Sequence, residues 1–228
     1  TKAELGAAYD GDGDRVVFVD ERGEIQPAER IFVLFIRHLL RQYPGAKVVY
    51  DLKSSSVVEE ATRAVGGQPL MEKSGHAFIK RRLIEEEALL GGEVSGHYFF
   101  AQIRGDDALY ATLLLLEILD DLGVSLGQAL DSVPVYPITP DIRLPCPPEK
   151  ARRIIEQLKV AFSDHRLNIL DGVRIQFLQG WALARVSVTE PVITLRFEAH
   201  SERELQKIKC QVRQASPLLQ EITTEAEY

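Results

Sequence analysis

Hydrophobic and polar positions in the first part of the chain follow two periods in turn. Short apolar runs such as "RVVFVD", "KVVYDL" and "QPLMEK" are typical of strands. Between and after them, helices are predicted by the spacing of apolar residues and by serine, proline and glycine at the expected ends, in "AERIFVLFIRHLLRQY", "SSSVVEEATRAVGG", "GHAFIKRRLIEEE" and "ALYATLLLLEILDDLG". We expect Asp106 or Asp107 to cap the last of these helices. Strands and helices that alternate at this spacing predict an α/β domain of three layers, with a mixed, largely parallel sheet.

The pattern changes near Val133. "VPVYPITPDIRLPCPP" has six prolines in sixteen residues, too many for a helix or a central strand, and we interpret it as a linker into a second domain. Beyond it we expect a helix from Glu149 to Phe162, strands in "GVRIQFL", "WALARVSV" and "VITLRFEA", and a final amphipathic helix in "SERELQKIKCQVRQA". This order predicts an α+β domain whose helices cover one face of an antiparallel sheet.

Composition and charge narrow the classes of function. A net charge of -7 and the absence of a basic block argue against a nucleic-acid partner, although a few local cations can still bind a phosphorylated small molecule. The longest apolar run is interrupted by Glu117 and is too short to cross a bilayer, so no membrane partner is expected. Cys146 and Cys210 form neither a metal-like cluster nor a disulfide framework. We therefore expect a reducing compartment, the cytoplasm.

The first chemical motif is "DGDGDR", which sets Asp10, Asp12 and Asp14 at alternate positions on a glycine-rich turn. Carboxylates at this spacing can converge on one hard divalent cation, and magnesium is the ion we expect. An EF-hand loop is a competitor, but Arg15 stands where that loop needs glycine, and the flanks predict strands rather than helices. A solvated acidic turn is the remaining alternative.

The second motif, "GEVSGH", alternates Glu93, Ser95 and His97, so that an extended segment would project all three side chains from one face. An acceptor, a hydroxyl and an imidazole suit the hydroxyl pair of a sugar, and the neighbouring glycines would let a ligand approach the backbone. A buried polar turn would have a similar sequence. "KSGH" partly repeats this motif upstream at His76, and Lys53 also follows a predicted strand, where ligands of such sheets bind.

The third motif, "RVSVTEP", lies between two predicted strands of the second domain. Arg185 offers a forked donor, and Ser187 and Thr189 add hydroxyls, which together can hold a phosphate dianion. A hairpin with polar residues is the alternative interpretation.

In this order, over essentially the whole chain, these motifs resemble the α-D-phosphohexomutase family, in particular its phosphomannomutase/phosphoglucomutase branch. The resemblance implies a cytoplasmic isomerase that interconverts hexose 1-phosphate and hexose 6-phosphate through a phosphoserine and a hexose 1,6-bisphosphate intermediate. The residue roles that it implies are Mg²⁺ ligands at Asp10, Asp12 and Asp14, catalytic groups at Arg15, Lys53, His76 and His97, and substrate contacts at Glu93, Ser95, Arg185, Ser187 and Thr189.

The chain also departs from the family pattern. No serine lies in a loop that resembles the family's Thr-Ala-Ser-His-Asn nucleophile signature, and Val188 stands where relatives commonly carry Asn or Gly. We therefore expect a C-terminal fragment that needs the missing N-terminal domains: the end of domain two at 1–19, a sugar-binding domain three at 20–133 and a phosphate-binding domain four at 134–228. A calcium-binding module, a phosphosugar-binding protein without catalysis and a phosphoglucosamine mutase remain as alternatives.

Overall fold

The computed structural model describes residues 3–187 and 189–223, and contacts within the chain divide it after Val135 into two compact units. Val188 lies outside the described residues. Among the helices of the described part, none has both the length and the apolar character that crossing a bilayer requires.

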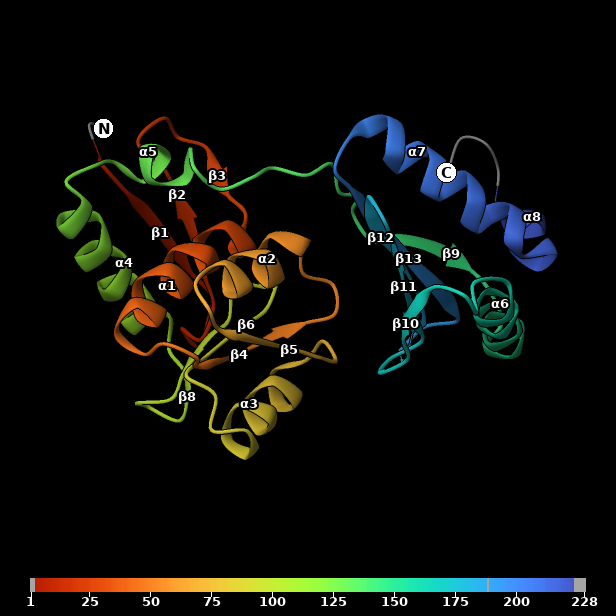
Figure 1. Ribbon diagram of the computed structural model, residues 1–228, viewed down its shortest axis with the longest axis horizontal. Coiled ribbons are helices and arrows are strands. Elements are labelled where there is room, and N and C mark those ends of the chain that lie inside the picture. The colour runs from red at the N-terminus through yellow and green to blue at the C-terminus, as the bar shows by residue number, and fades with distance from the viewer. Residues whose placement is uncertain (1–2, 188, 224–228) are drawn as a thin grey trace. The chain divides into compact units, whose positions relative to one another are not determined.

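The first unit contains, within the described residues, a small antiparallel sheet of order β1-β2-β3 and a five-stranded sheet of order β5-β4-β6-β7-β8 (Figure 1). Their strands are β1 (Gly6–Tyr9), β2 (Val16–Val19), β3 (Ile25–Gln26), β4 (Lys47–Asp51), β5 (Gln68–Glu72), β6 (Leu90–Gly92), β7 (Tyr98–Phe100) and β8 (Gly105–Asp106). The helices are α1 (Ala28–Gln42), α2 (Ser56–Ala64), α3 (His76–Glu85), α4 (Ala108–Leu122) and α5 (Leu126–Leu130). In the larger sheet, β5, β4 and β6 pair in parallel, whereas β6, β7 and β8 pair antiparallel. The predicted mixed α/β class is confirmed, with a smaller parallel share than the alternation suggested, because "GEVSGH" closes a hairpin.

Two adjacent glycines in β6 show how the layers fit together. A Cβ built on Gly91 would lie 3.1 Å from Ile79 of α3, whereas one built on Gly92 would lie 2.8 Å from the ring of Phe32 in α1. Since successive residues of a strand face opposite sides, α3 covers one face of the sheet and α1 the other. We expected these glycines to make room for a ligand, and this was wrong: side chains of the two helix layers fill the space.

The turn between β2 and β3 is organised by Asp20, whose side chain is buried. Its carboxylate accepts hydrogen bonds from the backbone N–H groups of Arg22 and Glu24 and from the side-chain amide of Gln26, each at 2.9 Å. Burial raises the pKa of Asp20, but the hydrogen bonds from Glu24 and Arg22 and the Arg22 charge lower it below its usual value. The domain boundary predicted between residues 19 and 20 falls at this turn and stays a prediction.

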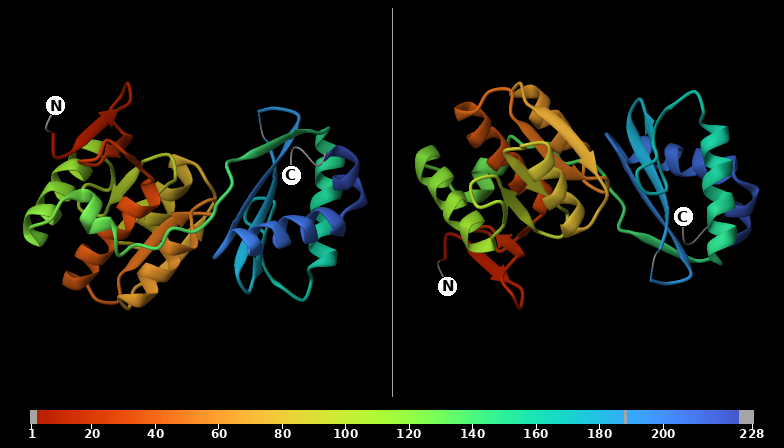
Figure 2. Two further views of the ribbon diagram at one scale, coloured as in Figure 1. Left: turned by 90° about the horizontal axis from the view of Figure 1, so that it is seen from above. Right: turned by 90° about the horizontal axis from the view of Figure 1, so that it is seen from below.

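The second unit is an antiparallel sheet of order β10-β11-β12-β13-β9 within the described residues. Its strands are β9 (Ile142–Pro145), β10 (Arg166–Asn168), β11 (Val173–Phe177), β12 (Gly180–Val186) and β13 (Val192–Ala199), and its helices are α6 (Pro148–Ala161), α7 (Glu202–Ala215) and α8 (Pro217–Ile222). Figure 2 shows these helices together on one side of the sheet, where they enclose an apolar core with Ala182, Ala184 and Leu195. This confirms the α+β architecture.

The opposite face of this sheet carries polar side chains. The Arg174 guanidinium lies 3.9 Å from the centre of the buried Trp181 ring, and Trp181 Nε1 donates a 2.8 Å hydrogen bond to Glu198 Oε1. The proline-rich segment holds a strand that we did not predict, since β9 pairs with the edge of β13. An edge position tolerates Pro145, which has no N–H to donate.

Candidate active site

The "DGDGDR" loop connects β1 and β2 and is organised by Asp10. The backbone N–H groups of Gly13 and Arg15 each donate a 3.2 Å hydrogen bond to Asp10 Oδ1, and Arg15 Nε donates to Asp10 Oδ2 at 2.6 Å. Burial raises the pKa of Asp10, but these contacts with Arg15 and a hydrogen bond with Asp12 lower it to about 2. Asp10 is therefore held as a carboxylate of fixed orientation.

The aspartates of this loop fit a hard divalent cation. Ligand oxygens of Asp10, Asp12 and Asp14 lie within 4.8 Å of one another. Asp14 Oδ1 is buried and accepts no hydrogen bond from the described residues, although His97 Nε2 lies 3.4 Å and Arg15 Nε 3.7 Å away. A carboxylate oxygen that accepts no hydrogen bond is available to bind a metal ion. A set of ligands that are all oxygens favours Mg²⁺ or Ca²⁺. The flanking strands exclude the helix–loop–helix of an EF-hand.

The "GEVSGH" loop packs directly on the "DGDGDR" loop. Val16 N–H donates to Gly96 O at 3.1 Å, and Arg15 forms a β-bridge with His97. Gly96 has φ +89°, and a Cβ there would lie 2.6 Å from Val16 O. Only glycine allows this approach of the two backbones.

Glu93, Ser95 and His97 come together, although the segment is a turn and not the extended geometry in which alternate side chains share one face. His97 Nδ1 lies 2.8 Å from Ser95 Oγ and 3.2 Å from Glu93 Oε2. Glu93 is buried and also accepts a 2.6 Å hydrogen bond from Gly75 N–H, whereas Ser95 is exposed. Burial lowers the pKa of His97, but the hydrogen bond to Glu93 and the surrounding carboxylate charges raise it above its usual value.

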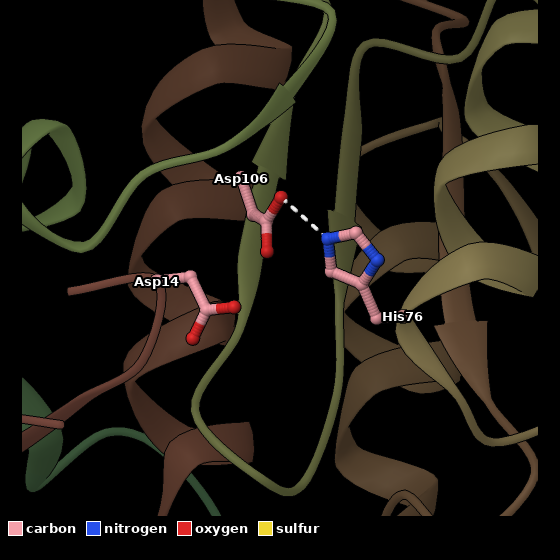
Figure 3. Close-up of side chains that lie close together, drawn as sticks. All are labelled: Asp14, His76 and Asp106. Atoms are coloured by element: carbon pink, nitrogen blue, oxygen red, sulfur yellow. Dashed lines mark hydrogen bonds and ion pairs between the residues drawn. The ribbon is translucent and has the colours of Figure 1, made fainter. Parts of the chain in front are cut away.

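The "KSGH" segment brings a second imidazole to the same place. His76 is the first residue of α3, and its ring centre lies 5.5 Å from that of His97. His76 Nε2 lies 2.9 Å from Asp106 Oδ1, and Figure 3 shows Asp14 on the same side of the ring as Asp106. In the first unit, the "DGDGDR" loop, His76 and the Glu93–His97 turn therefore lie close together.

The loop that carries Lys53 is tied to the "KSGH" segment by the side chain of Asp51. Asp51, at the end of β4, is buried and accepts hydrogen bonds from Ser54 Oγ at 2.6 Å and Ser74 Oγ at 3.1 Å. The loop that carries Lys53 is therefore fastened to the "KSGH" loop. Asp51 and Asp106 were not predicted from the sequence as members of this group. Asp51 follows an apolar run as Lys53 does, whereas Asp106 was considered only as a helix cap.

The predicted phosphate-binding residues lie in the second unit. Arg185, in β12, forms an ion pair of 3.3 Å with Asp171, and Ser187 Oγ accepts a 3.3 Å hydrogen bond from Glu190 N–H. Arg143 of β9 pairs with Glu190 at 2.6 Å. Thr189 lies in the same exposed bend. The segment is a polar turn with one half-buried arginine at its base.

Both units match models of one protein family. Residues 27–136 match the family model described as phosphoglucomutase/phosphomannomutase, alpha/beta/alpha domain III, and residues 142–215 match the C-terminal domain of the same family. The chain belongs to the phosphoglucomutase/phosphomannomutase family.

Three relatives illustrate the match. The phosphomannomutase/phosphoglucomutase of Pseudomonas aeruginosa is 38% identical over 211 residues, which cover 91% of this chain and 46% of that protein. The crystal structure of a phosphoglucomutase/phosphomannomutase family protein from Burkholderia thailandensis has a TM-score of 0.86 at 37% identity and covers 96% of this chain and 48% of that one. An N-acetylphosphoglucosamine mutase of Aspergillus fumigatus, in complex with GlcNAc-6P and magnesium, shares the fold at 20% identity, with a TM-score of 0.68 over 94% of this chain and 53% of that one. The chain spans about half the length of the curated relatives it matches.

Proposed function

We propose that this chain supplies three loops of a mutase that interconverts hexose 1-phosphate and hexose 6-phosphate. They are the metal loop "DGDGDR", the sugar loop "GEVSGH" and the phosphate loop "RVSVTEP". The observation that carries the proposal is the meeting of Asp14, His97 and His76 in the first unit. This arrangement puts metal-binding carboxylates beside imidazoles that can carry protons. The relatives are named phosphomannomutase/phosphoglucomutase, which supports the same reaction.

Asp10, Asp12 and Asp14 are the residues that would hold Mg²⁺, as the magnesium in the Aspergillus fumigatus mutase suggests by analogy. When bound, Mg²⁺ supplies positive charge that neutralises the oxygens of the transferring phosphoryl group. Arg15 adds a second positive charge at the same loop, where its half-exposed guanidinium also keeps Asp10 oriented.

The other predicted residues bind and orient the phosphosugar in this proposal. Ser95 and Glu93 contact ring hydroxyls, His76, His97 and Lys53 position the reacting groups and move protons, and Arg185, Ser187 and Thr189 hold the non-transferring phosphate. The phosphoryl group comes from a phosphoserine outside these 228 residues, through a hexose 1,6-bisphosphate that turns over in the site. We keep 1–19, 20–133 and 134–228 as the proposed domains.

The test is an assay with glucose 1-phosphate, glucose 1,6-bisphosphate and Mg²⁺. The protein encoded by the complete reading frame should form glucose 6-phosphate and should also accept mannose 1-phosphate. The 228-residue chain alone should form none, and robust turnover by it would overturn the phosphoserine route. An inactive complete protein would overturn the proposed function itself.

A phosphosugar- or metal-binding module without catalysis is the second candidate, since ion-pair and hydrogen-bond contacts alone can hold a phosphate. Calorimetry that shows tight calcium and negligible magnesium binding would favour it. Glucosamine 1-phosphate, tried as substrate in the mutase assay, distinguishes a phosphoglucosamine mutase from the glucose and mannose enzymes.

The two free thiols, Cys146 and Cys210, are consistent with the cytoplasm as the proposed location.

A further inference from the structure

Two adjacent aspartates at the start of α4 have different roles. Asp107 is the N-cap, and its Oδ1 accepts a 2.8 Å hydrogen bond from Tyr110 N–H. Asp106 makes no such contact and is instead the last residue of β8, where it pairs with Phe99 of β7. The pairing directs the Asp106 side chain to His76, at a distance of 2.9 Å between Oδ1 and Nε2.

The two partners differ sharply in exposure. The Asp106 side chain is 5% exposed, whereas the His76 side chain is 41% exposed. Asp106 Oδ2 is buried and has no hydrogen-bond partner among the described residues. A buried carboxylate is costly unless it is paired, and the contact with His76 is the hydrogen-bond-length contact that the Asp106 side chain makes among the described residues. A solvent-accessible imidazole backed by a buried carboxylate is an arrangement that fixes the ring rather than one that only joins two elements.

The chemistry of the pair decides which ring nitrogen carries the proton. An ionised carboxylate can only accept hydrogen bonds, so Nε2 of His76 must be the donor. When the ring is neutral, Nδ1 is then the free acceptor, and Figure 3 shows it on the side of the ring turned away from Asp106. The ring is also flanked by Phe99, at 5.4 Å between centres, and by His97. Its position is therefore set by contacts on several sides.

We propose that Asp106 is a positioning residue that holds the His76 imidazole as the Nε2–H tautomer and leaves Nδ1 as the free acceptor of the neutral ring. The contact of His76 with a phosphosugar rests on the proposed function, whereas the fixed tautomer does not.

The first experiment measures the tautomer directly. Nitrogen-15 NMR of the 228-residue chain, labelled at its five histidines and recorded where the imidazoles are neutral, distinguishes Nε2–H from Nδ1–H. We expect His76 as the Nε2–H form in the wild type and in the matched control Asp107→Asn, because asparagine is as good an N-cap as aspartate. Asp106→Ala should give a mixture of the two tautomers. An unchanged His76 spectrum in Asp106→Ala would overturn the proposal.

The second experiment uses the complete protein in the mutase assay. Asp106→Ala should lower kcat by about 10–100-fold, as is typical when the partner of a functional histidine is removed, with a smaller change in KM. If Asp106 acts through His76, the double variant Asp106→Ala/His76→Ala should lose no more activity than His76→Ala alone. Losses that multiply would overturn the proposal, once circular dichroism shows each variant folded. A wild-type protein without mutase activity would refute the proposed function and leave the tautomer result standing.

Discussion

Replacing Gly96 with alanine tests how the "GEVSGH" loop is held against the "DGDGDR" loop. Gly96 has φ +89°, and an added Cβ would meet Val16 O at 2.6 Å. The left-handed backbone costs a residue with a Cβ about 1–2 kcal/mol. The clash also pushes apart the 3.1 Å hydrogen bond from Val16 N–H to Gly96 O, which contributes about 1 kcal/mol. We expect a total loss of about 2–3 kcal/mol in the free energy of unfolding.

Gly66→Ala is the matched control, because Gly66 has φ +78° and nothing within 4 Å of its added Cβ. It should lose the backbone contribution alone, so the difference between the two variants isolates the contact with Val16. Urea unfolding should be followed by far-UV circular dichroism, since Trp181 is the single tryptophan and lies in the second unit. Equal losses in the two variants would refute this account of the loop.

Three further variants test other parts of the structure. Asp12→Asn removes an exposed carboxylate from the metal loop and should weaken Mg²⁺ binding about tenfold by calorimetry, and an unchanged affinity would argue against the site. Asp20 has a folded-state pKa below its unfolded value, so its contribution to stability is present above the unfolded pKa and is lost as pH falls through the folded pKa. Asp20→Asn should therefore shift the urea midpoint at about pH 6 far more than at about pH 2, and equal shifts would contradict this. Trp181→Phe removes the hydrogen bond to Glu198 and should cost about 1–3 kcal/mol in unfolding free energy, so a loss under about 0.5 kcal/mol would count against that contact.

The sequence predicted the features that depend on local pattern. The glycines and alternating carboxylates of "DGDGDR" act within one short loop, and the apolar spacing of α1 and α4 is a property of each helix alone. The convergence of Glu93, Ser95 and His97 was also predicted, although from the alternation of an extended segment, whereas a turn at Gly96 brings them together.

The missed features depend on which strands become neighbours. Asp106 reaches His76 only because β8 pairs with β7, and Asp51 joins two loops only because β4 and β5 end side by side. The strand β9 was missed because prolines weaken the strand pattern, yet an edge position beside β13 tolerates them. None of these pairings leaves a periodic signal in the sequence.

The glycine pair in β6 decides which positions of the "GEVSGH" loop can be varied. Helices on both faces occupy the space beside Gly91 and Gly92, so the base of this loop has no room for larger side chains. Its tip is different, since Val94 is partly exposed and Ser95 is exposed. Substitutions of Val94 and Ser95 should thus leave the scaffold intact, whereas larger side chains at Gly91 or Gly92 should not.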